Sequence, residues 1–139
     1  MTMDIRFIVT VRASHRAVDN SSCMEALHVG VAKSRLPGTA ILRLVGPLTL
    51  ATQFELENIL RQIPDADIIL DVYEAPYIDS AGLGIILAHW SHTRNRGGRF
   101  AMTGVTKRIQ MLLELTRVNT VLPVFRTPDE AELAFSGQR

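Results

Sequence analysis

The sequence predicts a small α/β domain built on a mixed sheet, and three observations support this fold class. Segments with a strand pattern alternate with segments of helical period along most of the 139 residues. A continuous apolar run at residues 68–72 suits a central strand that is buried on both faces. Turn residues at 36–39 predict an antiparallel hairpin, whereas the βαβ units that follow imply right-handed crossovers between parallel strands.

The first half of the chain is expected to form a hairpin, a helix and the central strand. Residues 27–31 and 40–46 are the two strands that flank the Pro-Gly turn. A helix follows, with Thr49 or Thr52 as its cap, and it ends at Pro64. The apolar positions of this helix, which we expect to face the core, are Phe54, Leu56, Ile59, Leu60 and Ile63.

The second half continues to alternate. A helix predicted over residues 80–95 ends at a Gly-Gly pair and carries one apolar stripe formed by Leu83, Ile86, Leu87 and Trp90. A strand at 99–104 precedes a helix that Thr106 caps, with an apolar face of Ile109, Leu112, Leu113 and Thr116. A short strand at 121–125 and a last helix capped by Thr127 complete the domain.

Residues 1–23 are expected to lie outside the compact domain, as an extension or tail. Apolar residues alternate from Ile5 to Val11, which is a strand pattern, whereas residues 13–22 are polar and have no period. We therefore expect the compact domain over residues 24–136 and a short tail at 137–139.

Composition argues against several function classes. The net charge is +1 and the basic residues are scattered, so we expect no nucleic-acid partner. Cys23 is the only cysteine, which excludes an internal disulfide and a multi-cysteine zinc site. No apolar run approaches the ~20 residues of a membrane span, and the first residues lack a secretion signal. We expect no direct membrane insertion and a cytoplasmic location.

The most informative segment is Asp-Ser-Ala-Gly-Leu-Gly at residues 79–84, where a helix is expected to begin. The first amides of a helix have no partner within it and the helix dipole is positive there, so a phosphate is favoured at Ser80. Gly82 and Gly84 each form helix less well than alanine by about 1 kcal/mol. They suggest that something approaches this turn closely. Helix capping by Asp79 and Ser80 alone remains the alternative explanation.

No catalytic constellation accompanies this serine. His89 and His92 are spaced to share a helix face, but no third metal ligand belongs to the pattern. The glycines do not flank Ser80 on both sides, as a hydrolase elbow requires, and no phosphate-binding loop is present. Residues 70–72 resemble the phospho-aspartate strand of a receiver domain without its magnesium-binding acids. We expect no enzyme activity, no catalytic residue, no metal and no cofactor.

From about residue 24 to 136 the sequence resembles STAS domains of the anti-sigma factor antagonist type. Three passages carry the resemblance, at residues 77–87, 96–109 and 121–131. It implies a mixed sheet of about five strands with about four helices packed mainly on one face. It also implies a non-catalytic module that exchanges protein partners.

The resemblance implies a phosphorylation switch at Ser80. An anti-sigma factor with serine kinase activity would bind the unphosphorylated domain and phosphorylate it, phosphorylation would release the complex, and a serine phosphatase would reset it. A phosphoserine adds about −1.5 to −2 charges at neutral pH. The residues expected to contact the partner are Thr49, Asp79, Ser80, Ala81, Gly82, Leu83 and Gly84.

The sequence departs from the family pattern at two places, and the first of them leaves an alternative open. The loop after the second strand usually carries acids, but here it contains Pro47 and Thr49. Arg117 stands where glycine is common. The domain would alternatively be a constitutive STAS scaffold, or a component of a lipid or anion transport assembly, without a phosphorylation switch. The alternating segment near Ile5 would also suit strand addition to a second copy in a homodimer.

Overall fold

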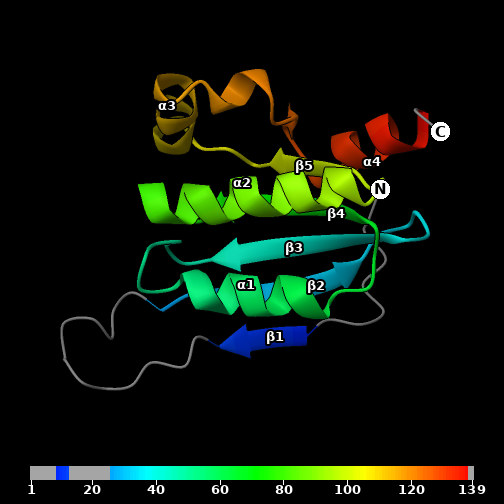
Figure 1. The fold of residues 1–139 in the computed structure, drawn as a ribbon, viewed down its shortest axis with the longest axis horizontal. Helices are drawn as coiled ribbons and strands as arrows, with labels where there is room; N and C mark the ends of the chain where they lie inside the picture. The colour runs from blue at the N-terminus through cyan, green and yellow to red at the C-terminus, as the bar shows by residue number, and fades with distance from the viewer. Residues whose placement is uncertain (1–8, 13–25, 138–139) are drawn as a thin grey trace.

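A computed structural model of the chain describes residues 9–12 and 26–137 (Figure 1). Within these residues the strands are β1 (Val9–Arg12), β2 (His28–Lys33), β3 (Thr39–Val45), β4 (Asp67–Glu74), β5 (Phe100–Thr103) and β6 (Val124–Phe125). The α-helices are α1 (Gln53–Gln62), α2 (Ser80–Asn95), α3 (Lys107–Leu115) and α4 (Pro128–Gly137), and a short 3-10 helix covers Val118–Thr120.

The described strands form one six-stranded sheet in the order β1-β2-β3-β4-β5-β6. β1, β2 and β3 are antiparallel neighbours, whereas β3, β4, β5 and β6 run parallel. The predicted mixed sheet is confirmed, with the hairpin at its antiparallel side. The βαβ units bring the carboxyl ends of the parallel strands to one end of the sheet.

β1 adds a strand to the five that were expected. Val9 lies opposite Val31 and Arg12 lies opposite His28, so part of the segment predicted to be separate pairs with β2. The other expectations for residues 1–8 and 13–23 lie outside the described residues, as does the end of the tail at 138–139.

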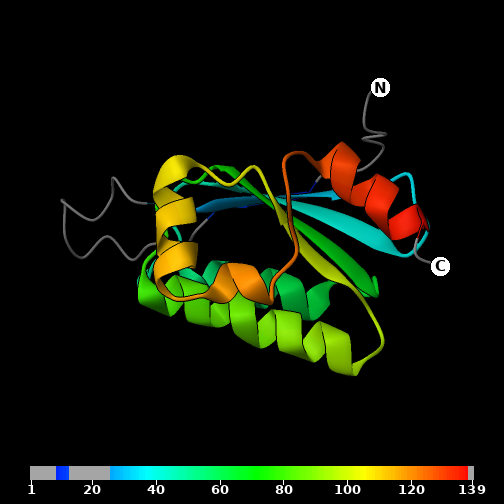
Figure 2. The ribbon, with the colours of Figure 1, turned by 90° about the horizontal axis from the view of Figure 1, so that it is seen from above.

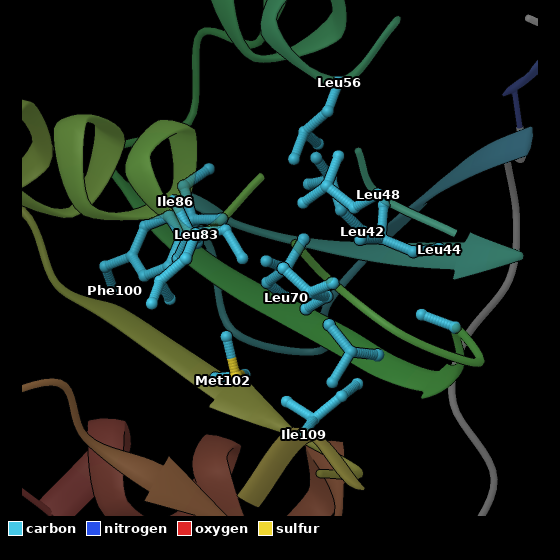
Figure 3. Close-up of a cluster of buried hydrophobic side chains, with 14 of the residues drawn as sticks. Leu42, Leu44, Leu48, Leu56, Leu70, Leu83, Ile86, Phe100, Met102 and Ile109 are labelled. Carbon is cyan, nitrogen blue, oxygen red and sulfur yellow. The ribbon is translucent and has the colours of Figure 1, made fainter. Parts of the chain in front are cut away.

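The helices cover the two faces of the sheet unequally (Figure 2). α1, α2 and α3 enclose the larger core, which is formed around the side chains labelled in Figure 3: Leu42, Leu44, Leu48, Leu56, Leu70, Leu83, Ile86, Phe100, Met102 and Ile109. α4 covers a smaller cluster on the opposite face, where Ala131 and Phe135 pack against Ile41, Ile69 and Ala101. The prediction that the helices pack mainly on one face is confirmed.

Two local predictions were wrong. Phe54 was expected in the core, but 66% of it is exposed, while Leu56 and Ile59 of the same helix are buried. The strand expected over 121–125 pairs only at Val124–Phe125. It is shorter because the amides of Val121 and Leu122 both bond the carbonyl of Val118, so the chain still turns there.

Arg117 has a left-handed backbone, with φ of 62°. It directly follows Thr116, the C-cap of α3, at a position where helices commonly place glycine. A left-handed conformation costs a residue with a Cβ about 1–2 kcal/mol, which a glycine would avoid. Glycine loses more conformational freedom on folding, and this reduces the gain in stability by about 0.5–1 kcal/mol.

Arg117→Gly is therefore expected to stabilise the domain by about 0.5–1 kcal/mol, seen as a higher urea midpoint. Arg117→Ala is the matched control, because it removes the same side chain but keeps the Cβ. A glycine variant no more stable than the alanine variant would show that the backbone here is not strained.

Glu132 joins α4 to the turn between β2 and β3. Its buried carboxylate accepts hydrogen bonds from the Ser34 hydroxyl and from Arg35, whose Nη2 lies 2.6 Å from Oε1. Burial opposes the charged form, but the hydrogen bonds from Ser34 and Arg35 outweigh it. They hold the pKa of the Glu132 carboxyl below its ordinary value.

A lowered pKa in the folded state stabilises the fold above the ordinary carboxyl pKa, and this stabilisation disappears as pH falls through the folded value. Glu132→Gln should therefore lower the free energy of unfolding at pH near 7. Its deficit relative to the wild type should shrink below about pH 4. Urea unfolding across this pH range measures the difference, and a deficit that does not depend on pH would contradict the linkage.

Candidate functional site

The candidate site lies at the end of the sheet where β3 and β4 finish and where α1 and α2 begin (Figure 1, left). Two loops that are distant in sequence join there. The amide of Leu48 bonds the carbonyl of Tyr77 at 3.2 Å, and the amide of Asp79 bonds the carbonyl of Leu48 at 3.1 Å. This isolated parallel bridge places the loop before α1 beside the turn that opens α2.

Asp79 strengthens the same junction with its side chain. It is the N-cap of α2, where its Oδ1 accepts a hydrogen bond from the amide of Gly82 at 2.8 Å. Its Oδ2 accepts a second hydrogen bond from the amide of Leu50 at 3.1 Å. Asp79 therefore caps the helix, as predicted, and also holds the neighbouring loop in place.

Ser80 is the first residue of α2 and is exposed. Of the four amides at the start of this helix, those of Asp79 and Gly82 have acceptors, at Leu48 and at the Asp79 side chain. Among the described residues, the amides of Ser80 and Ala81 and the Ser80 hydroxyl have no hydrogen-bond partner. Together with the helix dipole, these free donors favour an anionic group at Ser80.

The two glycines of the turn differ in what surrounds them. A Cβ on Gly82 would lie 2.4 Å from the carbonyl oxygen of Leu48, so the close approach at Gly82 is made by the chain itself. A Cβ on Gly84 would meet nothing within 4 Å, and Gly84 is exposed. Because an exposed glycine inside a helix costs about 1 kcal/mol, the packing of the domain does not account for Gly84.

The structure gathers all seven predicted contact residues at this junction but exposes only some of them. Ser80 and Gly84 are exposed, and Asp79 and Ala81 are partly exposed. The buried members are Thr49, Gly82 and Leu83. The hydroxyl of Thr49 accepts a hydrogen bond from the amide of Ala51, so it supports the loop from inside. Direct contact with a partner is therefore open to the first four residues only.

Sequence reasoning missed two apolar side chains at this site. Leu50 is 67% exposed and its amide bonds Asp79, and Phe54 is 66% exposed in the first turn of α1. The sequence held two signals: an apolar residue directly after Thr49, and the position of Phe54 about 200° round the helix from Leu56. We define the Ser80 surface as Leu50, Phe54, Asp79, Ser80, Ala81 and Gly84.

The loop in which the resemblance leads us to expect acids holds inward-packed residues instead. Pro47 and Thr49 are buried, and the Pro47 carbonyl accepts a hydrogen bond from the Thr52 hydroxyl at 2.8 Å. Gly46 has φ of 116°, and a Cβ on it would lie 2.3 Å from the carbonyl oxygen of Ala26. The loop is thus a compact support for Asp79, with no carboxylate of its own.

The described residues contain no group of three or more His, Cys, Asp or Glu side chains placed to hold a metal ion. Among these same residues, no helix has the length and apolar character needed to cross a membrane.

A comparison with protein families identifies the fold. A family model described as the STAS domain matches residues 31–131. The chain belongs to the STAS domain family. The resemblance inferred from the sequence is therefore confirmed at the level of the family.

The chain is also similar to individual proteins and solved structures. A curated relative, the anti-sigma F factor antagonist of Paenibacillus polymyxa, is 25% identical over 92 residues, which cover 63% of this chain and 79% of that protein. The fold is similar to that of an anti-sigma factor antagonist from Mycobacterium paratuberculosis, with a TM-score of 0.67 at 18% identity over 78% of this chain and 92% of that one. It is also similar to that of a sulfate transporter family protein from Wolinella succinogenes, with a TM-score of 0.65 at 24% identity over 76% and 89% of the two chains.

Proposed function

We propose that this STAS domain is an anti-sigma factor antagonist whose Ser80 surface binds an anti-sigma factor and releases it when Ser80 is phosphorylated. The observation that carries the proposal is the geometry of the Ser80 turn: an exposed hydroxyl beside two free amides, at the end of the sheet where Leu50 and Phe54 are also exposed. The curated relative, an anti-sigma F factor antagonist, supports the same assignment.

The role is non-catalytic and belongs in the cytoplasm, where the anti-sigma factor supplies serine kinase activity and a serine phosphatase restores Ser80. Before phosphorylation, the Ser80 surface has no side chain at Gly84 and exposes apolar side chains at Leu50 and Phe54. These features suit close packing of a protein partner. No nucleic acid is required.

Phosphorylation would act on the surface with little change inside the domain. The free amides and the positive end of α2 accommodate the phosphate, and both oxygens of Asp79 are already engaged by Gly82 and Leu50. The added charge would lie next to the Asp79 carboxylate and beside apolar side chains. Burying that charge under a partner is unfavourable, so the complex would dissociate.

The test compares Ser80→Asp with Ser80→Ala in binding to a purified anti-sigma factor kinase of the same organism. Ser80→Asp should weaken binding by about 100-fold or more, because like charge and desolvation at an interface cost several kcal/mol. Ser80→Ala should bind as the wild type does and accept no phosphate. Ser91→Asp is the matched control, since Ser91 is exposed near the other end of α2.

Incubation with the kinase and ATP, followed by mass spectrometry, should place the phosphate on Ser80. Phosphate on another residue, or a complex that Ser80→Asp leaves intact, would overturn the proposed switch.

The loop at Pro47 and Thr49 favours a second candidate, a constitutive scaffold or a component of a lipid or anion transport assembly. Both residues are buried and neither supplies the acid that usually accompanies the serine. In that case the domain would co-purify with membrane proteins, and neither Ser80 substitution would alter the complex.

A further inference from the structure

A second feature lies at the opposite end of α2 from Ser80. Because α2 has 16 residues, these two ends are about 24 Å apart. A pocket of about 170 Å³ opens there between the last turns of α2 and α4, at the β6 edge of the sheet. These two helices lie on opposite faces of the sheet (Figure 2). The residues that define this α2–α4 pocket are Trp90, Arg94, Arg99, Pro123, Phe125 and Phe135.

The charge at the pocket is positive and only partly matched. Arg99 is held by Asp67, whose Oδ2 lies 3.0 Å from Nη2, and its guanidinium stacks 4.5 Å from the centre of the Phe135 ring. Arg94 lies 5.1 Å from the centre of the Trp90 ring and has no carboxylate within ion-pair distance in the described part of the chain. Arg94 therefore places a cation, without a carboxylate partner among the described residues, beside the aromatic side chains of the pocket.

Three carbonyls near the end of α2 are already engaged within the chain, which weakens their opposition to a bound anion. The carbonyls of His92, Thr93 and Arg94 accept hydrogen bonds from the amides of the segment 96–98. An anion bound at Arg94 would thus face satisfied carbonyls, with less of the repulsion expected at an open helix end.

The size of the pocket limits what it can hold. Pockets for larger cofactors and drug-sized ligands occupy about 300–1,000 Å³, whereas a cavity of about 150 Å³ accepts one benzene ring. The aromatic walls suit a flat ring, and a guanidinium binds a carboxylate or phosphate through paired hydrogen bonds. We propose that the α2–α4 pocket binds a small acid built on a single planar ring, with the ring beside Trp90 and Phe125 and the anionic group on Arg94.

Trp90 is the only tryptophan in the chain, so its fluorescence and its indole N–H signal in NMR report on this pocket directly. The probes are benzoate and phenyl phosphate, with benzamide as the uncharged match for benzoate. We expect at least one acid to give a saturable change at Trp90. If benzoate gives it, benzamide should bind about tenfold more weakly or worse, because a hydrogen bond to a charged group is lost.

Arg94→Gln should weaken binding of the acid by a similar factor. Arg96→Gln, the matched control at an exposed arginine that does not line the pocket, should leave it unchanged. Ala134 also lines the pocket, so Ala134→Leu should abolish binding by filling it. Circular dichroism checks that each variant is folded. Any one of three results would overturn the proposal. They are that neither acid gives a saturable response, that benzamide binds as tightly as benzoate, or that the Arg94→Gln variant binds the acid as the wild type does.

Discussion

Asp67→Ala is expected to destabilise the domain by about 3 kcal/mol, near the lower end of the range for breaking a buried ion pair. The Asp67 side chain is 1% exposed. Its Oδ1 accepts a hydrogen bond from the Arg99 amide at 2.8 Å, and its Oδ2 accepts one from Arg99 Nη2 at 3.0 Å. One carboxylate thus joins the start of β4 to the start of β5, and its removal leaves two donors without these partners.

The loss is placed at the lower end because Arg99 keeps some contact with water. Its side chain is 22% exposed and retains its hydrogen bond to the Phe135 carbonyl and its stacking on the Phe135 ring. Arg99 Nε is already buried without a hydrogen-bond partner, so the wild type carries part of the cost of burying this guanidinium. Both facts reduce what the substitution can add.

Asp67→Asn separates shape from charge. The side-chain carbonyl oxygen of the asparagine can still accept a hydrogen bond from the backbone amide of Arg99. The expected loss in the free energy of unfolding is therefore about 1–2 kcal/mol. Urea unfolding, followed by Trp90 fluorescence, measures the free energy of unfolding of both variants. If the slope of this free energy against urea concentration is unchanged, only the stability has changed. If the asparagine variant is as unstable as the alanine variant, the charge and not the hydrogen bonding of Asp67 dominates.

The elements that depend on neighbours in sequence could be predicted. α2 was expected over residues 80–95 and is observed at Ser80–Asn95. The prediction succeeded because Asp79 caps the helix with its own side chain and Gly97 ends it with φ of 84°. Thr106 and Thr127 also accept the hydrogen bonds expected of caps, from Ile109 and Glu130. Capping is local chemistry, so it is visible in the sequence.

The contacts between loops could not be predicted in this way. Phe54 is apolar, yet it stands two residues before buried Leu56 and therefore about 200° round α1, on the outer face, although Thr52 before it is buried. The second hydrogen bond of Asp79, to Leu50, depends on the bridge between Leu48 and Ile78, and no spacing in the sequence indicates that bridge. The sequence therefore did not show that Leu50 lies beside the turn that opens α2.

The different surroundings of Gly82 and Gly84 also depend on the fold, and substitutions at these two glycines test partner binding at the Ser80 surface. In Gly82→Ala, the added Cβ would lie 2.4 Å from the carbonyl oxygen of Leu48 and 2.9 Å from its Cγ, so the backbone must move. Overpacking of this kind costs about 1–3 kcal/mol, and better helix propensity returns about 1 kcal/mol. We expect a net loss of stability, measured by urea unfolding. Because Asp79 holds the displaced loop, we also expect weaker binding of the anti-sigma factor.

Gly84→Ala should change stability in the opposite direction. Nothing lies within 4 Å of the added methyl group, so the helix gains about 1 kcal/mol. Ala88→Gly, at an exposed position one turn further along α2, calibrates this contribution with the reverse substitution. If a partner packs against the Ser80 surface, the same methyl group should weaken binding although the domain has become more stable. No general damage to the fold produces that combination. A variant that is more stable and binds unchanged would place the contact elsewhere on the domain, and Gly84 would then have no explanation in partner binding.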